Sequence, residues 1–253
     1  MFVINQSKLF GRNETFANVP KEIAPGDGML QPGDQEHYFV VGASASAAIN
    51  DALRTARIAP KNISRVLDYA CGYGRVLRWL KADFPAAYLV GVDADPKAAR
   101  AAGNVVGVET RALDITLAGG LGDPFDLIWV GSLFTHLPAQ ETARVLRYLR
   151  GHLTNIGVLV FTTHGAIVEQ RLSSRTRIYG LAEDAVDTVL LGVSQSGYGF
   201  AGYPHSPSYG ISIARPSRMI AMLEAEGMRS IMFKDQGWAA HQDVYASRLA
   251  PDA

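Results

Sequence analysis

The sequence predicts an α/β fold, in which helices cover both faces of a mostly parallel sheet. Between residues 65 and 164, short apolar segments rich in β-branched residues alternate with segments of helical periodicity. This alternation is typical of parallel strands joined by helices. The 253 residues are 48% hydrophobic and 19% charged, which is typical of an ordered globular protein with a sizeable core.

The expected strands and helices can be placed in order along the chain. The predicted strands of the central region are residues 65–70, 87–93, 106–113, 125–132 and 157–164. The predicted helices there are residues 43–58, 74–84, 95–103, which Gly103 closes, and 138–153, which Pro138 begins. A helix over 216–227 and two strands over 228–235 and 243–249 follow near the end of the chain.

Shifts in composition divide the chain into four parts. Residues 1–41 hold a Pro/Gly-rich stretch and no sustained period, so we expect an irregular N-terminal arm that serves as a lid. Residues 42–164 form the predicted cofactor-binding core, and residues 214–253 complete its sheet. Residues 165–213 are rich in Gly, Ser and Tyr. Because a structureless loop of ~50 residues is uncommon inside a compact domain, we expect an inserted cap on the acceptor side.

Charge and cysteine content argue against several classes of function. Lys and Arg number 24, as do Asp and Glu, so the formal net charge is zero and does not favour binding to nucleic acid or to an anionic membrane. The single cysteine, Cys71, leaves no internal disulfide and no cysteine-built zinc site. The chain lacks an apolar run of the roughly 18 residues that a membrane helix needs. Its first residues lack the apolar core of a signal peptide, so we expect a cytoplasmic protein.

The segment 66–75, with the sequence VLDYACGYGR, carries the clearest functional signal. It leads from a buried strand, through a turn with glycines at alternate positions, into a helix whose free N–H groups can face a ligand. A dinucleotide-binding turn has the pattern G-x-G-x-x-G, but Leu77 stands at the third glycine position. The carboxylate of Asp68 suits a ligand that carries a cation, such as the α-ammonium and sulfonium of S-adenosylmethionine. Its alternative role is a strand-end cap.

Two further carboxylates follow the next two strands. Asp93 ends the second strand, 19 residues after Gly74, where it can accept hydrogen bonds from both ribose hydroxyls. Its alternative role is the N-cap of the next helix. Asp114 follows the third strand and can accept from an adenine amino group while Ile115 packs against the ring; alternatively Asp114 is a turn residue.

Four motifs in this order resemble those of class I S-adenosylmethionine-dependent methyltransferases. They are DYACGYGR, GVDADP, ALDI and FDLIWVGSLFTHLP, within residues 60–165. The resemblance implies a Rossmann-like, doubly wound, seven-stranded sheet whose last strand is antiparallel, with 228–235 and 243–249 as the final pair. It also implies S-adenosyl-L-methionine as the cofactor. Similar bacterial enzymes have no assigned substrate, and some are associated with glycan modification.

The motifs define the expected cofactor-binding residues. These are Asp68, Ala70, Gly72, Tyr73, Gly74, Arg75, Asp93, Ala94, Asp114, Ile115 and Ser132. Ala70 stands where the family has its first glycine, and since alanine favours negative φ, we expect a negative φ there. Arg75 is expected either to pair with the cofactor carboxylate or to form a salt bridge within the protein. Tyr73 either lines the methionine end of the cofactor or only packs.

Methyl transfer to a hydroxyl requires a base, and ligands of parallel sheets lie beyond the carboxyl ends of the strands. His136 follows the fourth strand, His164 ends the fifth, and His241 and Asp243 precede the last. We expect the base to be His136, His164 or the His241/Asp243 pair; alternatively each histidine shapes the pocket. The histidines lie on separate segments without metal-ligand spacing, so no metal is expected.

The inserted segment suggests a small polar acceptor. It carries aromatic and histidine side chains suited to stacking on a sugar, namely Tyr179, Tyr198, Phe200, Tyr203, His205 and Tyr209. The first hypothesis is O-methylation of a small hydroxylated molecule such as a sugar unit. The alternatives are N- or carboxyl-methylation, a non-catalytic cofactor-binding module and a nicotinamide-dependent oxidoreductase. Nucleic acid is disfavoured as a partner because VGSLFTH lacks the loop that seats a flipped base.

Overall fold

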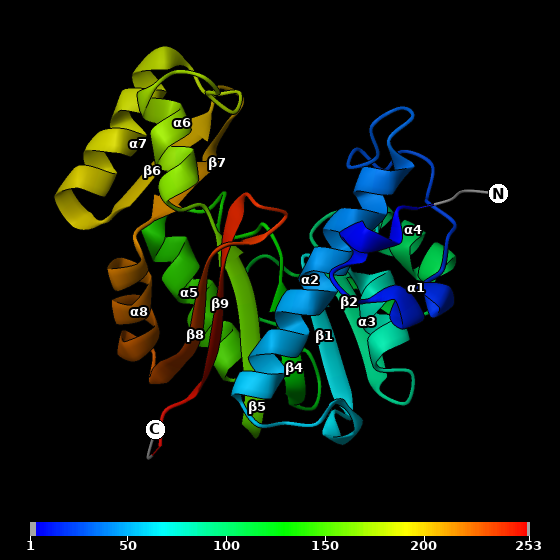
Figure 1. Ribbon diagram of the computed structural model, residues 1–253. Coiled ribbons are helices and arrows are strands. Elements are labelled where there is room, and N and C mark those ends of the chain that lie inside the picture. The colour runs from blue at the N-terminus through cyan, green and yellow to red at the C-terminus, as the bar shows by residue number, and fades with distance from the viewer. Residues whose placement is uncertain (1–3, 252–253) are drawn as a thin grey trace. The chain divides into compact units, whose positions relative to one another are not determined.

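The computed structural model describes residues 4–251, and its strands form the predicted sheet. Seven strands follow the order β3-β2-β1-β4-β5-β9-β8, and β9, the last strand in the sequence, is antiparallel to both β5 and β8. A separate two-stranded sheet contains β6 and β7. This topology confirms the expected α/β, Rossmann-like fold class. The chain divides into two compact units, one ending at Trp129 and the other beginning at Val130 (Figure 1).

The first unit contains the strands β1, β2 and β3 and nearly all of β4. β1 pairs in parallel with β2, and β2 with β3. Its elements are η1 (Gln6–Leu9), α1 (Asn13–Asn18), α2 (Gln35–Thr55), η2 (Pro60–Asn62), β1 (Arg65–Tyr69), α3 (Leu77–Asp83), β2 (Tyr88–Asp93), α4 (Pro96–Val106), β3 (Glu109–Ala112) and β4 (Phe125–Val130).

Capping residues explain where two of these helices begin and end. Helix α2 begins at Gln35, before the expected residue 43, because the side chain of Asp34 caps it by accepting from the N–H of His37. Helix α4 runs through Gly103 and ends at Gly107, which takes the left-handed conformation of a C-cap. The expected end of this helix at Gly103 is therefore wrong.

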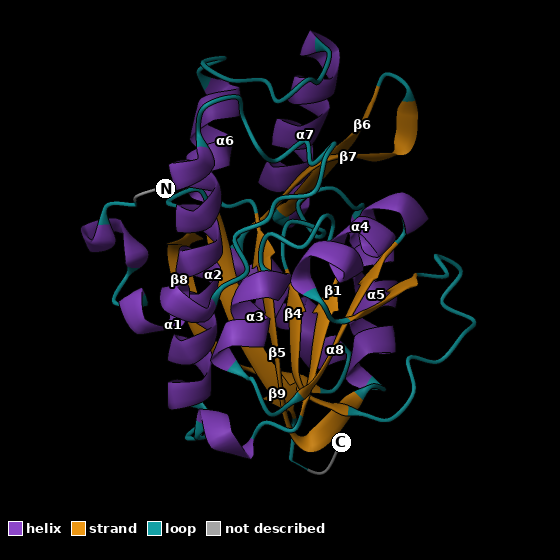
Figure 2. Cartoon of the chain, turned by 90° about the vertical axis from the view of Figure 1, so that its right-hand side faces the viewer, coloured by secondary structure: helices purple, strands orange, loops and turns teal. Residues whose placement is uncertain are grey.

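The N-terminal arm is partly helical and packs on the first unit. Its residues Ile4, Leu9 and Val19 share a hydrophobic cluster with Phe39 and Trp79. Helices α1, α2 and α3 pack against one another around this cluster (Figure 2). The arm is therefore more ordered than the irregular segment that we expected from its sequence.

The second unit contains the remaining strands. Its elements are α5 (Ala139–Arg150), β5 (Leu153–Thr163), α6 (Ala166–Ser173), α7 (Glu183–Ser196), β6 (Tyr198–Tyr203), β7 (Ser206–Ala214), α8 (Pro216–Ala225), β8 (Met228–Trp238) and β9 (Gln242–Leu249). β8 and β9 form the expected final antiparallel pair.

The inserted segment folds into two helices and a hairpin. Helices α6 and α7 lie beside the hairpin of β6 and β7 (Figure 1). They share a hydrophobic cluster that includes Val168, Leu172, Val189 and Ile213, all at most 1% exposed. The segment therefore has its own core. Within residues 4–251, no helix is both long enough and apolar enough to cross a membrane.

Candidate active site

A buried carboxyl group, with one oxygen that lacks a hydrogen-bond partner among the described residues, lies near the end of β1. Asp68 lies opposite Gly91 of β2 and is only 2% exposed. Its Oδ2 atom has no hydrogen-bond partner within residues 4–251. Burial, reinforced by the carboxylate of Asp93, raises the pKa of Asp68 to about 8. Because an unpaired buried acceptor costs free energy, the position suits a ligand that brings a cationic donor.

The glycine loop, residues 70–76, follows β1 with alternate left-handed residues. The φ angle is 64° at Ala70, 54° at Gly72 and 87° at Gly74. The expectation of a negative φ at Ala70 is therefore wrong. A β-carbon on Gly74 would lie 3.0 Å from Val106 Cγ2, so the glycine there allows helix α4 to approach the loop closely.

Two hydrogen bonds to β2 explain the left-handed turn at Ala70. The N–H of Cys71 donates to the carbonyl of Val92 at 3.0 Å, and the N–H of Gly72 donates to Asp93 Oδ2 at 2.7 Å. The chain must turn sharply after β1 to make both bonds. The conformation at Ala70 is thus imposed by β2 and not by the preference of alanine.

Asp93 is not the N-cap of helix α4. Asp95 has that role, since its side chain accepts from the N–H of Lys97 at 2.8 Å. Asp93 Oδ1 accepts from the N–H of Asp95 at 2.9 Å, and exposed Ala94 lies between them. Each oxygen of Asp93 retains a second lone pair, which can accept from a ribose hydroxyl.

Asp114 and Ile115 lie in an exposed turn after β3. Asp114 Oδ1 accepts from the side-chain hydroxyl of Thr116 at 2.7 Å and from its N–H at 2.9 Å. These bonds lower the pKa of Asp114 and make it a turn residue, which was the alternative role. Ile115 is 66% exposed, so an aromatic ring can pack against its side chain.

Arg75 and Tyr73 lie against the N-terminal arm. Burial lowers the pKa of Arg75, and nearby Tyr38 and Asp27 oppose this effect. Tyr38 is fully buried and donates to Asp27 Oδ2 at 2.7 Å, so it is a core residue and not part of a lid surface. A β-carbon on Gly26 would lie 3.8 Å from the Tyr73 hydroxyl. Residues 26–38 therefore border the glycine loop.

These residues of the first unit fit S-adenosylmethionine. The orphaned Oδ2 of Asp68 can pair with its α-ammonium group, and Asp93 can accept from its ribose hydroxyls. The glycine loop lets the backbone approach the ligand. The first unit therefore brings together Asp68, Gly72 and Asp93, three of the residues that the motifs predicted.

In the second unit, the three predicted histidines line one cavity of about 570 Å³. The ring centroids of His136 and His164 are 6.3 Å apart, and those of His164 and His241 are 5.3 Å apart. The rings come from the loop after β4, the end of β5 and the turn between β8 and β9. Other side chains in the lining include Arg177, Tyr179, Tyr203 and Gln242.

Strand β7 fixes two of the histidines through its backbone. The carbonyl of Gly210 accepts from His136 Nδ1 at 2.6 Å, and the carbonyl of Ser212 accepts from His164 Nδ1 at 3.1 Å. Since a carbonyl only accepts, both Nδ1 atoms carry the proton and both Nε2 atoms hold a lone pair. No residue in the described part of the chain donates a hydrogen bond to either Nε2 atom.

All three imidazoles are neutral at pH 7. Burial lowers the pKa of His136. Burial and then the neighbouring rings of His241 and His136 lower the pKa of His164 to about 3. For His241, burial and then the charges of Arg171 and Arg177 lower the pKa. Neutral rings with a free lone pair can accept a proton, which is what a general base requires.

His241 has the opposite tautomer. Arg171 donates to His241 Nδ1 at 2.9 Å and to the Tyr179 hydroxyl at 3.2 Å. An arginine only donates, so Nδ1 of His241 holds the lone pair and Nε2 carries the proton. His241 therefore presents a hydrogen-bond donor, and this geometry does not fit its expected role as the base.

Asp243 is buried on β9, opposite Thr163 at the end of β5. It is 1% exposed, and its Oδ1 accepts from the N–H of Gln236 at 2.9 Å. A β-carbon on Gly165 would collide with the Asp243 carboxylate. Burial raises the pKa of Asp243 to about 6. Asp243 does not line the cavity, so it does not fit the expected His241/Asp243 base pair.

Ser132, expected among the cofactor residues, lies in the lining of the histidine cavity. Its φ angle is 61°, and its N–H donates to Thr162 Oγ1 at 2.8 Å. Gln242 Nε2 donates to Ser132 Oγ at 3.0 Å, which fixes the hydroxyl. Across residues 4–251, no group of three or more His, Cys, Asp or Glu residues is arranged to hold a metal ion.

Sequence reasoning did not identify two arginines at this cavity. Arg177 lines the cavity. Arg171 is not in the lining but donates hydrogen bonds to His241 and Tyr179, which are. The only sequence signal was the concentration of three arginines within residues 171–177, in a segment without a clear period. Their positions depend on the fold of the inserted segment.

Comparison with known proteins supports the resemblance that the motifs predicted. Residues 66–157 match a family model described as "Methyltransferase domain". No curated protein matches the chain. The predicted resemblance to methyltransferases is thereby confirmed over residues 66–157.

Several solved structures share the fold. An S-adenosylmethionine-dependent methyltransferase from Clostridium acetobutylicum has a TM-score of 0.58 at 14% identity, covering 82% of this chain and 92% of its own. The sugar N-methyltransferase KedS8 from Streptoalloteichus has 0.57 at 18%, covering 83% and 88%. Magnesium protoporphyrin IX methyltransferase from Synechocystis, with bound SAH, has 0.55 at 12%, covering 94% of both chains.

Proposed function

We propose that this chain, whose residues 66–157 form a methyltransferase domain, is an S-adenosylmethionine-dependent O-methyltransferase that acts on a small hydroxylated molecule such as a sugar unit. The observation that carries the proposal is the neutral ring of His136. Its Nδ1–H is fixed on the Gly210 carbonyl, and its Nε2 lone pair has no partner among the described residues.

The first unit would hold the cofactor. Asp68 binds the α-ammonium group, Asp93 binds the ribose, and the turn at Asp114 and Ile115 borders the adenine. Arg75 would pair with the carboxylate of the methionine part. The N-terminal arm, which borders the glycine loop, would act as the lid.

The second unit would bind the acceptor. S-adenosylmethionine supplies a methyl group activated on sulfonium, so the reaction is an in-line displacement that depends chiefly on alignment. His136 Nε2 takes the proton of the acceptor hydroxyl while its oxygen bonds to the methyl carbon. The electron pair of the broken C–S bond remains on sulfur. His164 is only 4% exposed and would orient the acceptor, whereas half-buried His136 is the better-placed base.

The aromatic residues of the inserted segment support a sugar-like acceptor. Tyr209 stacks on His136, with ring centroids 4.7 Å apart, and Tyr203 lies 6.2 Å from the same ring. Such rings combine an apolar face with a hydroxyl, which suits a polar ring. KedS8, which shares the fold, is a sugar N-methyltransferase, so an amine on a sugar is the alternative acceptor.

A ligand comparison tests the cofactor. S-adenosylhomocysteine should raise the melting temperature, because a ligand at a hundred times its Kd adds about 2.7 kcal/mol to the free energy of unfolding. NADH and ATP should have no such effect. Stabilisation by NADH alone would favour the oxidoreductase alternative and contradict the proposal.

Histidine variants test the base. With radiolabelled S-adenosylmethionine and a panel of sugars, amino sugars, sugar acids and sugar phosphates, His136→Gln should lower kcat about a hundredfold or more. His164→Gln should chiefly raise KM. Because the pKa of His136 is lowered, kcat of the wild type at saturating S-adenosylmethionine should not decline until the pH is below 6.5. Unchanged kcat in His136→Gln would refute the base, and transfer to nitrogen alone would favour the alternative acceptor.

A further inference from the structure

The histidine cavity carries positive charge that the proposed base does not use. Arg177 lies in its lining, with its guanidinium carbon 4.8 Å from the centre of the Tyr179 ring. Arg171 is outside the lining and donates hydrogen bonds to two lining residues, His241 and Tyr179. Among the described residues that line the cavity, none is a carboxylate.

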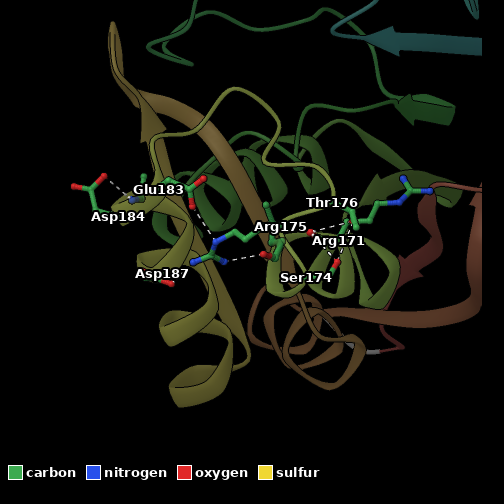
Figure 3. Close-up of polar contacts among 9 residues, drawn as sticks. Arg171, Ser174, Arg175, Thr176, Glu183, Asp184 and Asp187 are labelled. Atoms are coloured by element: carbon green, nitrogen blue, oxygen red, sulfur yellow. Dashed lines mark hydrogen bonds and ion pairs between the residues drawn. The ribbon is translucent and has the colours of Figure 1, made fainter.

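Two of the three acidic residues of helix α7 form ion pairs with a different arginine. Arg175 forms ion pairs with Glu183 and Asp187, and the side chain of Arg171 extends in the opposite direction (Figure 3). Neither Arg171 nor Arg177 forms an ion pair with any residue in the described part of the chain. The segment 171–177 at the end of α6 and in the following loop thus has one arginine that is paired with carboxylates, Arg175, and two without a counter-charge among the described residues, Arg171 and Arg177.

Hydrogen-bond donors gather beside these two arginines. His241 has its proton on Nε2, since Nδ1 accepts from Arg171. The oxygen of the Tyr179 hydroxyl accepts from Arg171, so its own proton can be donated to a ligand. Tyr179 has a φ of 54°, a conformation that costs a non-glycine residue free energy and that often marks a functional position.

The lining therefore has two chemical sides. Arg177, Tyr179 and His241 offer donors and a positive charge, whereas His136 and His164 offer Nε2 lone pairs. A neutral sugar would use the lone pairs but would leave the guanidinium of the exposed Arg177 to be solvated by water, without a counter-ion. A hydroxylated anion satisfies both sides, because its hydroxyl donates to a histidine and its oxyanion accepts from the arginine.

We propose that the acceptor carries an oxyanion, a carboxylate or a phosphate, which Arg177, Tyr179 and His241 bind while Arg171 holds the latter two in place. The inference rests on the proposed function, since it defines the chemical class of the molecule that the same cavity accepts. The specificity residue is Arg177, and Arg171 is a positioning residue.

Binding measured by NMR tests this assignment without requiring turnover. The imidazole signals of His136, His164 and His241 are followed in the full-length protein, saturated with S-adenosylhomocysteine, while one probe is added. The probes are D-glucuronate, glucose 1-phosphate, inorganic phosphate and uncharged methyl α-D-glucoside. We expect saturable shifts of the His241 signal with the anions, and at least tenfold weaker binding of the glucoside. Tighter binding of glucuronate than of the phosphates identifies a carboxylate, and the reverse identifies a phosphate.

A matched pair of arginine variants provides the control. Arg177→Gln should weaken anion binding tenfold to a hundredfold, as expected for a lost charged hydrogen bond of about 1.5–3 kcal/mol. Arg175→Gln removes the same charge from the same loop but from the side of the α7 carboxylates, so binding should stay within about twofold of the wild type.

Three results would overturn the proposal: binding of the glucoside as tight as that of every anion, unchanged binding of the favoured anion in Arg177→Gln, or no saturable shift with any anion. None of these three results contradicts the proposed function, provided that S-adenosylhomocysteine still binds and a neutral hydroxyl is methylated. Failure of S-adenosylhomocysteine to bind would instead refute the proposed function, while the anion shifts would still report on the cavity.

Discussion

The proposed role of Asp68 predicts that cofactor binding releases a proton. Its pKa of about 8 keeps most of the group protonated at pH 7 in the free protein. An α-ammonium group favours the ionised form, so the pKa must fall when the ligand binds. The affinity for S-adenosylhomocysteine should therefore decrease as the pH falls below 8, by up to about tenfold per pH unit.

Asp68→Asn should separate stability from binding. Between the ordinary pKa of 3.8 and about 8, the native protein holds a proton that the unfolded chain has lost, so Asp68 makes the fold less stable as the pH rises. Asparagine removes this cost. In urea titrations, the free energy of unfolding should exceed that of wild type at pH 8 but not at pH 4, while binding of S-adenosylhomocysteine is lost. A variant that is less stable at pH 8 would show that the buried carboxyl group is satisfied.

Ala70→Gly should stabilise the protein. Alanine with a φ of 64° costs roughly 1–2 kcal/mol, and glycine avoids this cost but makes the unfolded chain more flexible. We expect the free energy of unfolding to rise by about 1 kcal/mol, measured by urea titration. A loss of stability would contradict this expectation. It would mean that packing of the Ala70 β-carbon contributes more free energy than the left-handed conformation costs. Gly72→Ala is the matched comparison, and should destabilise because it creates the same strain.

Strand β7 positions two histidines of the cavity, although it belongs to the inserted segment. Gly210, Ser212 and Ala214 donate backbone hydrogen bonds to the carbonyls of His136, Thr135 and His164, respectively. The carbonyls of Gly210 and Ser212 also set the tautomers of the two histidines. The hairpin therefore shapes the chemistry of the cavity as well as bordering it.

Arg78 of helix α3 forms hydrogen bonds to both the N-terminal arm and the glycine loop. It is fully buried, and its guanidinium donates to the carbonyls of Gly74, Pro20 and Glu22 and to the Tyr38 hydroxyl. These four bonds are a tertiary contact that no local pattern in the sequence could reveal.

Arg78→Met should release the arm. The substitution leaves buried carbonyls without donors, so we expect a loss of about 3 kcal/mol in the free energy of unfolding and faster proteolysis within residues 4–34. Arg100→Met, at an exposed position of α4, is the control and should change neither measurement. Equal proteolysis of the two variants would contradict an anchoring role for Arg78.

The strands were predictable from the sequence, whereas several boundaries and side-chain states were not. β1, β2 and β4 are apolar runs, and their order along the chain gave the positions of Asp68, Asp93 and His136. Helix α4 continues past Gly103. A β-carbon at Gly103 would lie 2.5 Å from Thr110 Oγ1, so a glycine is needed there for close packing against β3 and does not mark the end of the helix. Such effects depend on residues distant in sequence.

The same limit applies to the inserted segment and the histidine cavity. Helices α6 and α7 pack on their own hairpin, so their apolar residues follow no pattern of the main sheet. The gathering of the histidines followed from the rule that sites lie beyond strand ends. Their tautomers did not, because backbone carbonyls of β7 and the side chain of Arg171 determine them.

In the whole molecule, the predicted cofactor residues around Asp68 lie in the first unit, and the histidine cavity lies in the second. The two roles can therefore be altered separately. Substitutions at Asp68 or Asp93 should change the affinity for S-adenosylhomocysteine, whereas substitutions at His136 or Arg177 should change only acceptor binding and transfer. A family match over residues 66–157 supports the first role alone, so the second depends on the chemistry of the cavity.

Calorimetric titration of the protein with S-adenosylhomocysteine at pH 7, in two buffers with different enthalpies of ionisation, tests the central claim most directly. The wild type and His136→Gln should bind one molecule and release about one proton, because the Asp68 carboxyl group ionises as the ammonium group enters. Asp68→Asn should bind weakly and release none. Binding without proton release in the wild type, or equal affinity in Asp68→Asn, would contradict the account.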